Sequence, residues 1–173
     1  KCLFLGYNKK RTKLINFLKK KKIKVVNKNT ALLKRDLKTF DIIISFGYRK
    51  IIPKNLIKEC KRPIINLHMS YLPFNKGAHP NFWSFVNNTT KGVSIHEIDE
   101  GIDTGKIIYQ KKIKFKKVKN LTFQKTYNTL FREIEKLFIK NFHLILKRKY
   151  QLKKNTNLKG QTHYINSLPK NIK

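Results

Sequence analysis

Short apolar runs of strand length alternate with amphipathic stretches along most of the chain. Two of these runs, 40–48 and 63–68, contain consecutive Ile residues, which is typical of central strands buried on both faces of a parallel sheet. Residues 112–116 instead alternate Lys with apolar residues, as in a strand with one face in water. The pattern predicts strands at 2–7, 23–26, 40–48, 63–68, 92–98 and 105–116.

The stretches between these runs repeat their apolar residues at the helical period. Helices are predicted at 9–20, 53–60, 79–88 and from Thr122 to about Lys147. Strands that alternate with helices predict an α/β fold, namely a Rossmann-like, doubly wound, mostly parallel sheet with helices on both faces. We expect one folded domain over 1–150, followed by a short basic tail over 151–173.

The composition adds an unusual charge. The chain has 173 residues, of which 41 are Lys or Arg and only nine are Asp or Glu, giving a formal net charge of +32. Such a surface attracts polyanions, so a basic module that binds nucleic acid is one interpretation. A compositional bias toward Lys, Asn and Ile is the other. Two cysteines, no signal-peptide pattern and no apolar run of membrane-spanning length predict a cytoplasmic protein with no membrane partner, and no metal site is expected.

Polar residues at one strand end suggest chemistry. In a parallel α/β sheet, ligands bind beyond the carboxyl ends of the strands. Asn66 and His68 close the strand 63–68, and residues two apart in a strand point to the same side. An Asn amide can donate to an oxygen that gains negative charge, and a neighbouring His can stabilise that oxygen or move a proton. Asp103, in a loop between Gly101 and Gly105, supplies a carboxylate.

Each of these residues also has a structural interpretation. Asn and His at a strand end commonly form turns, and Asp103 alone could be a turn residue. His96 lies within a predicted strand, which favours a structural role. No Ser or Cys nucleophile motif and no glycine-rich phosphate loop accompany the group, so direct transfer to a substrate nucleophile is the chemistry that the residues predict.

Three ordered segments carry a resemblance to a known family: INLHMSYLP (65–73), KGAHPNFWSF (76–85) and KGVSIHEIDEGIDTGKII (91–108). They resemble the catalytic core of the 10-formyltetrahydrofolate-dependent formyltransferases, and the similarity extends over about 40–113. The resemblance implies that 10-formyltetrahydrofolate is the cosubstrate and that Asn66, His68 and Asp103 form the catalytic triad. It places the acceptor side at Ser70, Lys76 and His79. The pterin pocket that it implies is lined by Phe46, Gly47, Tyr48, Ile51, Ile52, Glu97, Ile98, Asp99, Glu100 and Gly101.

The amine acceptor divides this family. The motifs PNFWSF and IDEGIDTG most resemble the sugar N-formyltransferases, which favours a small-molecule acceptor, an amino sugar carried on a nucleotide. A methionyl-tRNA formyltransferase-like enzyme without the C-terminal domain stays open, because the positive charge suits tRNA. A glycinamide ribonucleotide formyltransferase is disfavoured, since no Gly/Ser-rich loop follows the first strand. Lys76 stands where the family commonly has Arg, which replaces a bidentate fork by a point charge. A homodimer is also left open.

Overall fold

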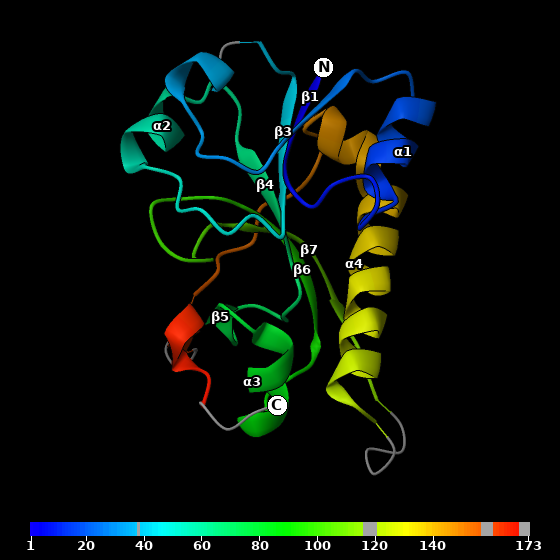
Figure 1. The fold of residues 1–173 in the computed structure, drawn as a ribbon, viewed down its shortest axis with the longest axis vertical. Coiled ribbons are helices and arrows are strands. Elements are labelled where there is room, and N and C mark those ends of the chain that lie inside the picture. Colours follow the sequence, from blue (N-terminus) through cyan, green and yellow to red (C-terminus); the bar gives the residue numbers. More distant parts are fainter. Residues whose placement is uncertain (38, 116–120, 157–160, 170–173) are drawn as a thin grey trace.

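A six-stranded sheet forms the centre of the computed structural model, which describes residues 1–37, 39–115, 121–156 and 161–169 (Figure 1). The strand order is β2-β1-β3-β4-β6-β7. These strands are β1 (Cys2–Gly6), β2 (Val25–Lys28), β3 (Ile42–Phe46), β4 (Ile64–His68), β6 (Gly92–Glu97) and β7 (Ile107–Lys112). A separate two-stranded sheet pairs β5 (Lys76–Gly77) with β8 (Thr162–His163).

The first four strands in the spatial order run parallel, and β6 alone runs against its neighbours β4 and β7. Strands β1 and β3 are buried along their whole length, as expected for strands covered on both faces. The predicted mostly parallel α/β sheet is therefore confirmed. The carboxyl ends of β1, β3 and β4 lie at the same edge, which is where the candidate residues Asn66 and His68 are found.

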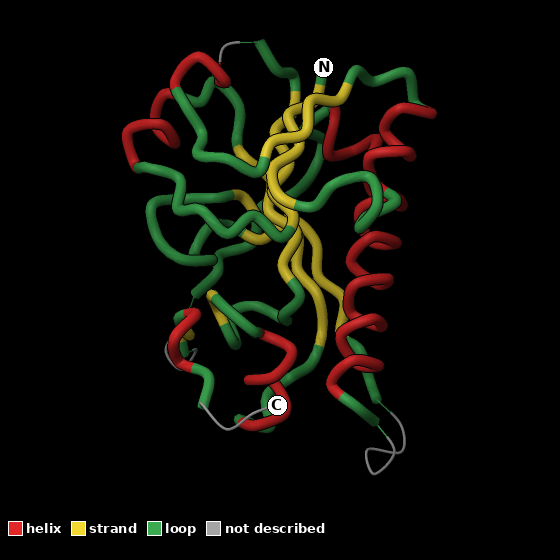
Figure 2. The backbone as a smooth tube through the Cα atoms, viewed as in Figure 1, coloured by secondary structure: helices red, strands yellow, loops and turns green. Residues whose placement is uncertain are grey.

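Helices cover both faces of the sheet (Figure 2). Helices α1 (Leu14–Lys20) and α4 (Phe123–Leu146) contribute to the larger apolar core on one face. Helix α2 (Lys54–Glu59) and the 3-10 turn η1 (Lys34–Leu37) contribute to a smaller core on the other face. The remaining elements are α3 (Pro80–Val86) and the 3-10 turn η3 (Ile165–Ser167).

Several observed elements are shorter than the sequence pattern predicts, and β2 (Val25–Lys28) lies two residues later than expected. Helix α1 begins at Leu14 because the chain turns on the Asn8 carbonyl, which accepts from the amides of Arg11 and Thr12. Strand β7 ends at Lys112, and the end of the predicted strand, Lys116, lies outside the described residues. Helix α4 agrees with its prediction within a residue at each end. Its cap residue Thr122 accepts from the amide of Lys125 at 3.2 Å.

Helix α4 is joined to the sheet by both apolar and polar contacts. The side chain of Phe138 is fully buried in the larger core. Glu135, also buried, accepts from the Thr12 hydroxyl at 2.6 Å and from the Lys13 amide at 3.0 Å. Because Lys13 precedes α1, this carboxylate holds the start of α1 against the middle of α4.

The contribution of this packing can be measured by truncating Phe138. Replacing Phe138 by Ala should lower the free energy of unfolding by about 3–5 kcal/mol, because a large buried side chain leaves a cavity that the sheet cannot fill. Urea unfolding followed by circular dichroism measures the change. The exposed Lys140 on the same helix provides a matched control, for which Lys140→Ala should change stability by less than about 0.5 kcal/mol. A loss below 1 kcal/mol in Phe138→Ala would contradict the packing of α4 on the sheet.

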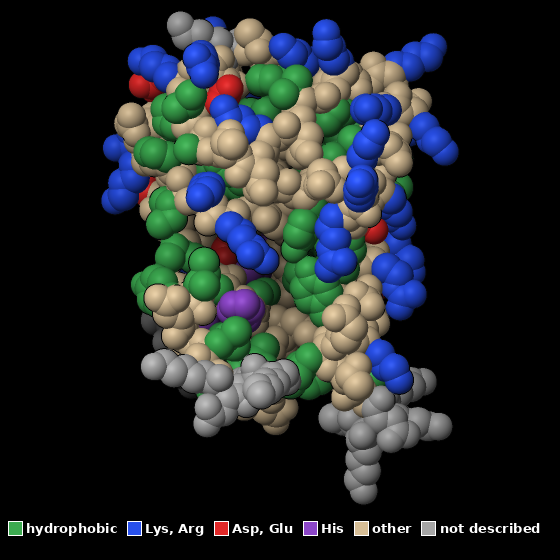
Figure 3. All heavy atoms as spheres, viewed as in Figure 1, with side chains coloured by type: hydrophobic (Ala, Val, Ile, Leu, Met, Phe, Trp, Pro, Cys, Tyr) green, Lys and Arg blue, Asp and Glu red, His purple; other side chains and the backbone are tan. Residues whose placement is uncertain are grey.

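Lys and Arg side chains are spread over much of the face of the molecule drawn in Figure 3. Figure 3 shows Lys and Arg side chains over the upper part of this face and along the edge formed by α1 and α4, with few acidic side chains among them. None of the described helices is both long and apolar enough to cross a bilayer.

Candidate active site

Strand β4 and its neighbour β6 present four polar side chains to one edge of the sheet. Asn66 pairs in register with His96, and His68 pairs with Ser94. Since alternate residues of a strand share a face, this register brings Asn66, His68, Ser94 and His96 to one side of the strand pair. A tightly turned loop after β6 then carries Asp103 to these residues, and Asp103 itself adopts a left-handed backbone with φ of +50°.

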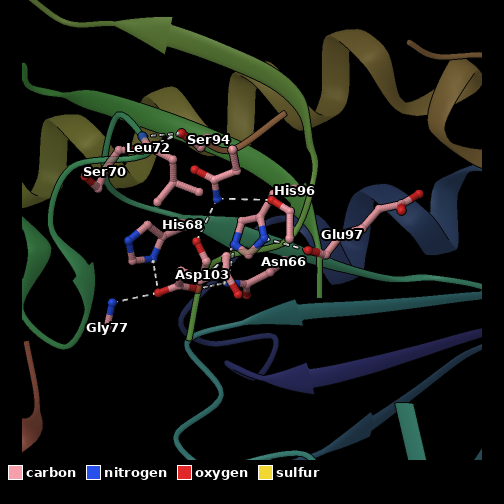
Figure 4. A network of polar contacts seen from close by, with 12 residues as sticks. Asn66, His68, Ser70, Leu72, Gly77, Ser94, His96, Glu97 and Asp103 are labelled. Carbon is pink, nitrogen blue, oxygen red and sulfur yellow. Dashed lines mark hydrogen bonds and ion pairs between the residues drawn. The ribbon is translucent and has the colours of Figure 1, made fainter. Parts of the chain in front are cut away.

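Asp103 is the centre of the resulting network (Figure 4). One carboxylate oxygen, Oδ1, accepts from Asn66 Nδ2 at 3.0 Å and lies 3.2 Å from His96 Nε2. The other, Oδ2, accepts from the Gly77 amide at 2.8 Å and lies 3.5 Å from His68 Nδ1. Two separate chain segments, the end of β4 and the loop after β6, therefore converge on one carboxylate, as the sequence predicts.

The surroundings keep this carboxylate ionised. Burial alone would raise the pKa of Asp103, but the nearby imidazoles of His68 and His96 and the Gly77 amide outweigh it and hold the pKa well below its usual range. The bonds from Gly77 and Asn66 do not depend on any protonation state. With its pKa lowered in this way, Asp103 carries a negative charge at neutral pH.

His68 is held between two oxygen acceptors. Its Nε2 lies 3.2 Å from the carbonyl oxygen of Asn75, and its Nδ1 faces Asp103. Burial lowers the pKa of His68 and outweighs the opposing pull of Asp103, so the ring is neutral at pH 7 and carries a single N–H. One ring nitrogen then faces an oxygen without a proton between them. Accepting a proton would satisfy both contacts, which suits His68 to the role of proton acceptor.

The amide of Asn66 has its two hydrogens directed to different partners. Besides Asp103 Oδ1, Nδ2 lies 3.0 Å from His96 Nε2. The Nδ1 of His96 lies 2.7 Å from the Glu97 carbonyl, which can only accept, so Nδ1 carries a proton and Nε2 accepts from Asn66 in the neutral ring. To accept from Asn66, an oxyanion must therefore share an N–H of its amide with Asp103 Oδ1 or His96 Nε2, or displace one of these two acceptors.

The two segments expected to line a pterin pocket both contribute to the smaller core, through Ile52 and Ile98. Glu100 Oε atoms lie 3.4 Å from Lys54 and 3.2 Å from Lys58, which ties the 97–103 loop to helix α2. Each segment exposes an apolar side chain: Ile51 is 88% exposed and Ile102 is 39% exposed. Exposed apolar residues on neighbouring loops fit the flat ring of a folate, which would cover them.

Other residues expected in that pocket serve the fold as well. Phe46 packs against Tyr7 and Phe131 in the core, with ring centroids 4.9 and 4.8 Å apart. The left-handed Gly47 lies against the Tyr7 ring, where a Cβ would come within 2.2 Å of it. Ile52 and Ile98 pack in the smaller core. The remaining four form hydrogen bonds. The Tyr48 hydroxyl donates to Thr30 O, Glu97 accepts from Tyr150, and Asp99 accepts from the Thr104 hydroxyl and from the amide of Gly101.

Of the three residues expected on the acceptor side, Ser70 and Lys76 are buried and His79 is exposed. Ser70 is buried and donates to the Phe74 carbonyl, so its hydroxyl shapes the loop after β4. Lys76 is only 5% exposed, beside the Gly77 amide that binds Asp103. His79 is exposed and has a left-handed φ of +52°, and partial desolvation followed by the charge of Arg49 lowers its pKa.

Three network residues escape sequence reasoning. His96, 1% exposed, was expected to be structural, but the register of β6 on β4 places its ring against Asn66 and Asp103. The available signal was that Ser94 and His96 are two residues apart in β6, as Asn66 and His68 are in β4. Asn75 contributes its backbone carbonyl, which no sequence pattern marks. Asn155 donates to the Asp103 and Gly105 carbonyls from the tail, a contact between distant segments.

Comparison with known proteins places this geometry in a family. The formyl transferase family model matches residues 5–141, so the chain belongs to the formyl transferase family. The formyltransferase PseJ from Anoxybacillus kamchatkensis, solved in complex with UDP-4,6-dideoxy-4-formamido-L-AltNAc and tetrahydrofolate, is 40% identical, with a TM-score of 0.87 over 95% of this chain and 85% of that one.

Curated relatives divide between two acceptors. GDP-perosamine N-formyltransferase from Brucella melitensis is 32% identical over 62% of this chain and 40% of its own length. Methionyl-tRNA formyltransferase from Prochlorococcus marinus is 38% identical over 69% of this chain and 34% of its own length. This chain therefore spans well under half the length of these curated relatives.

Proposed function

We propose that this protein is an N-formyltransferase that moves a formyl group from 10-formyltetrahydrofolate to the amine of a nucleotide-linked amino sugar. The observation that carries the proposal is the convergence of Asn66, His68 and Asp103 in one network of contacts between 3.0 and 3.5 Å. An ionised carboxylate, a neutral imidazole and an amide donor are the groups that acyl transfer to an amine requires.

The folate would supply a formyl carbon that an amine can attack. As the amine adds, it must lose a proton, and neutral His68 is placed to accept it. The resulting imidazolium donates to Asp103 Oδ2 and to the Asn75 carbonyl. As the adduct collapses, the bond between the formyl carbon and the folate nitrogen would break, the proton would pass from His68 to that nitrogen, and tetrahydrofolate would leave with the formamide formed. Asn66 donates to the formyl oxygen as that oxygen gains charge, an interaction worth about 3–4 kcal/mol for one well-placed donor.

The choice of acceptor is supported by the relatives. The PseJ complex holds a formylated UDP-linked amino sugar, and PseJ is 40% identical to this chain over nearly its whole length. Methionyl-tRNA is the second candidate, favoured by the net charge of +32 and by the relative at 38% identity. The structural contacts around Asp103 serve either acceptor, because both present a primary amine.

A panel of acceptors distinguishes these candidates. The purified protein is incubated with formyl-labelled 10-formyltetrahydrofolate and, separately, with UDP-, GDP- and dTDP-linked amino sugars, glycinamide ribonucleotide and methionyl-tRNA. We expect labelled product with at least one nucleotide-linked amino sugar, and a kcat/KM for methionyl-tRNA at least about 100-fold lower. Transfer to methionyl-tRNA alone would replace the sugar proposal. Transfer to none, with label release to water alone, would contradict both.

A further inference from the structure

The segment after helix α4 returns to the active-site loop. Lys153 forms an antiparallel bridge with Ile107 in β7, with the Ile107 amide donating to the Lys153 carbonyl at 2.9 Å and the Lys153 amide donating back at 2.8 Å. Two residues later, Asn155 reaches the loop that carries Asp103. This bridge fixes the register of the returning segment, so the position of Asn155 is set by backbone pairing.

The side chain of Asn155 clamps the loop on both sides of its turn. Its Nδ2 donates to the carbonyl of Asp103 at 2.8 Å and to the carbonyl of Gly105 at 3.1 Å. Carbonyl oxygens only accept, so the orientation of this amide is fixed: the nitrogen faces the loop. Both hydrogens of one amide thereby hold two carbonyls of the same turn.

The turn that Asn155 clamps is strained and closely packed. Asp103 has a φ of +50°, a conformation that costs a residue with a side chain about 1 kcal/mol or more. Gly105 passes so close to β6 that a Cβ there would lie 1.8 Å from the Glu97 carbonyl oxygen. A strained conformation persists only where its surroundings hold it, and the Asp103 backbone has Asn155 as a side-chain partner.

We infer that Asn155 is a positioning residue for the transfer reaction, holding the Asp103 backbone so that its carboxylate stays beside His68 and Asn66. This inference rests on the proposed function for its kinetic effect and on the two hydrogen bonds of Asn155 for its structural effect. A displacement of about 1 Å at a catalytic group can cost about 100-fold in rate. Asn155 contacts backbone carbonyls of the loop, so it acts through Asp103.

The test replaces the donor without changing its shape. Asn155→Asp puts a carboxylate against the carbonyls of Asp103 and Gly105, which repels both, and Asn155→Ala removes the clamp and leaves space. We expect kcat for formyl transfer to fall by about 100-fold in Asn155→Asp and by about 10-fold or more in Asn155→Ala, with KM for the folate changed by less than about threefold. Hydrogen exchange of the 98–106 segment should accelerate by about 10-fold or more in both variants.

Asn141 provides the matched control. Its Nδ2 donates to the Leu137 carbonyl within helix α4 at 2.8 Å, so Asn141→Asp makes the same chemical change at a carbonyl outside the loop. We expect this control to keep kcat and the exchange of 98–106 at wild-type values.

Each outcome bears on the inference separately from the proposed function. Unchanged exchange of 98–106 in both Asn155 variants would overturn the inference, whatever the activity. Equal acceleration across the whole chain would also overturn it, because Asn155 would then support the fold in general. If exchange accelerates locally but kcat is unchanged in a working enzyme, the positioning role falls. If the wild-type protein transfers no formyl group, the proposed function fails, and local exchange still decides whether Asn155 holds the loop.

Discussion

Asp103→Asn should reduce kcat for formyl transfer by about 1000-fold or more, while leaving the fold intact. The amide keeps the shape of the carboxylate but removes the charge that would stabilise a protonated His68 across 3.5 Å. It also replaces one of the two oxygens by an NH2 group, which would face either the Gly77 amide or Asn66, donor against donor, so the network must rearrange. Steady-state rates with a saturating acceptor measure the loss.

A carboxylate outside the site provides the control for this variant. Asp41 is exposed just before β3, at the end of that strand opposite the site, so Asp41→Asn should keep the wild-type kcat. Circular dichroism and thermal unfolding of Asp103→Asn establish that it folds. A folded Asp103→Asn variant with more than a tenth of wild-type activity would show that the carboxylate is not part of the transfer machinery.

The second large effect is expected at His68. Replacing it by Ala removes the proton acceptor and should lower kcat by about 100- to 10,000-fold. His143 lies exposed on α4, and His143→Ala should leave kcat unchanged. If His68→Ala retained the wild-type rate, another group would have to accept the amine proton, and the proposed role of the imidazole would be wrong.

The pH dependence of the wild-type rate follows from the same residue. Burial lowers the pKa of His68 below its usual value of 6.5, so the neutral, proton-accepting form should prevail at pH 7 and be lost only on further acidification. The rate should therefore be level near pH 7 and fall on the acid side of 6.5. In Asp103→Asn, the charge that raises this pKa is gone, so the acid limb of the residual activity should move to lower pH.

The free energy of unfolding should also decrease as the pH falls below 6.5. Between the lowered pKa of folded His68 and 6.5, the unfolded chain binds more protons than the folded one. The contribution of His68 to folding is thus complete above 6.5 and declines as the pH falls toward the folded value. Asp103, whose pKa is also lowered, adds a contribution that is lost only at more acidic pH.

The sequence was most informative where pattern and geometry coincide. The unbroken Ile-rich runs at 40–48 and 63–68 predict buried parallel strands, and β3 and β4 lie within them. The spacing of Asn66 and His68 implies a shared face because strand geometry leaves no alternative. The division of the chain into a catalytic domain over 1–150 and a tail stays a prediction, and the contacts of Lys153 and Asn155 join the two segments.

Contacts set by tertiary pairing could not be obtained in this way. His96 reaches Asn66 only because β6 runs antiparallel to β4 in one particular register, and the sequence does not specify that register. Asn75 acts through its backbone carbonyl, which every residue type possesses. The partners of Asn155 are 50 and 52 positions away, so no local period connects them.

A double-mutant cycle of His68 and Asp103 in formyl transfer is the most direct measurement of whether these two segments act as one catalytic unit. If they do, His68→Ala combined with Asp103→Asn should transfer formyl no more slowly than the slower single variant, since either change already disables the unit. If the rate loss of the double variant instead equals the product of the two single losses, the imidazole and the carboxylate act independently.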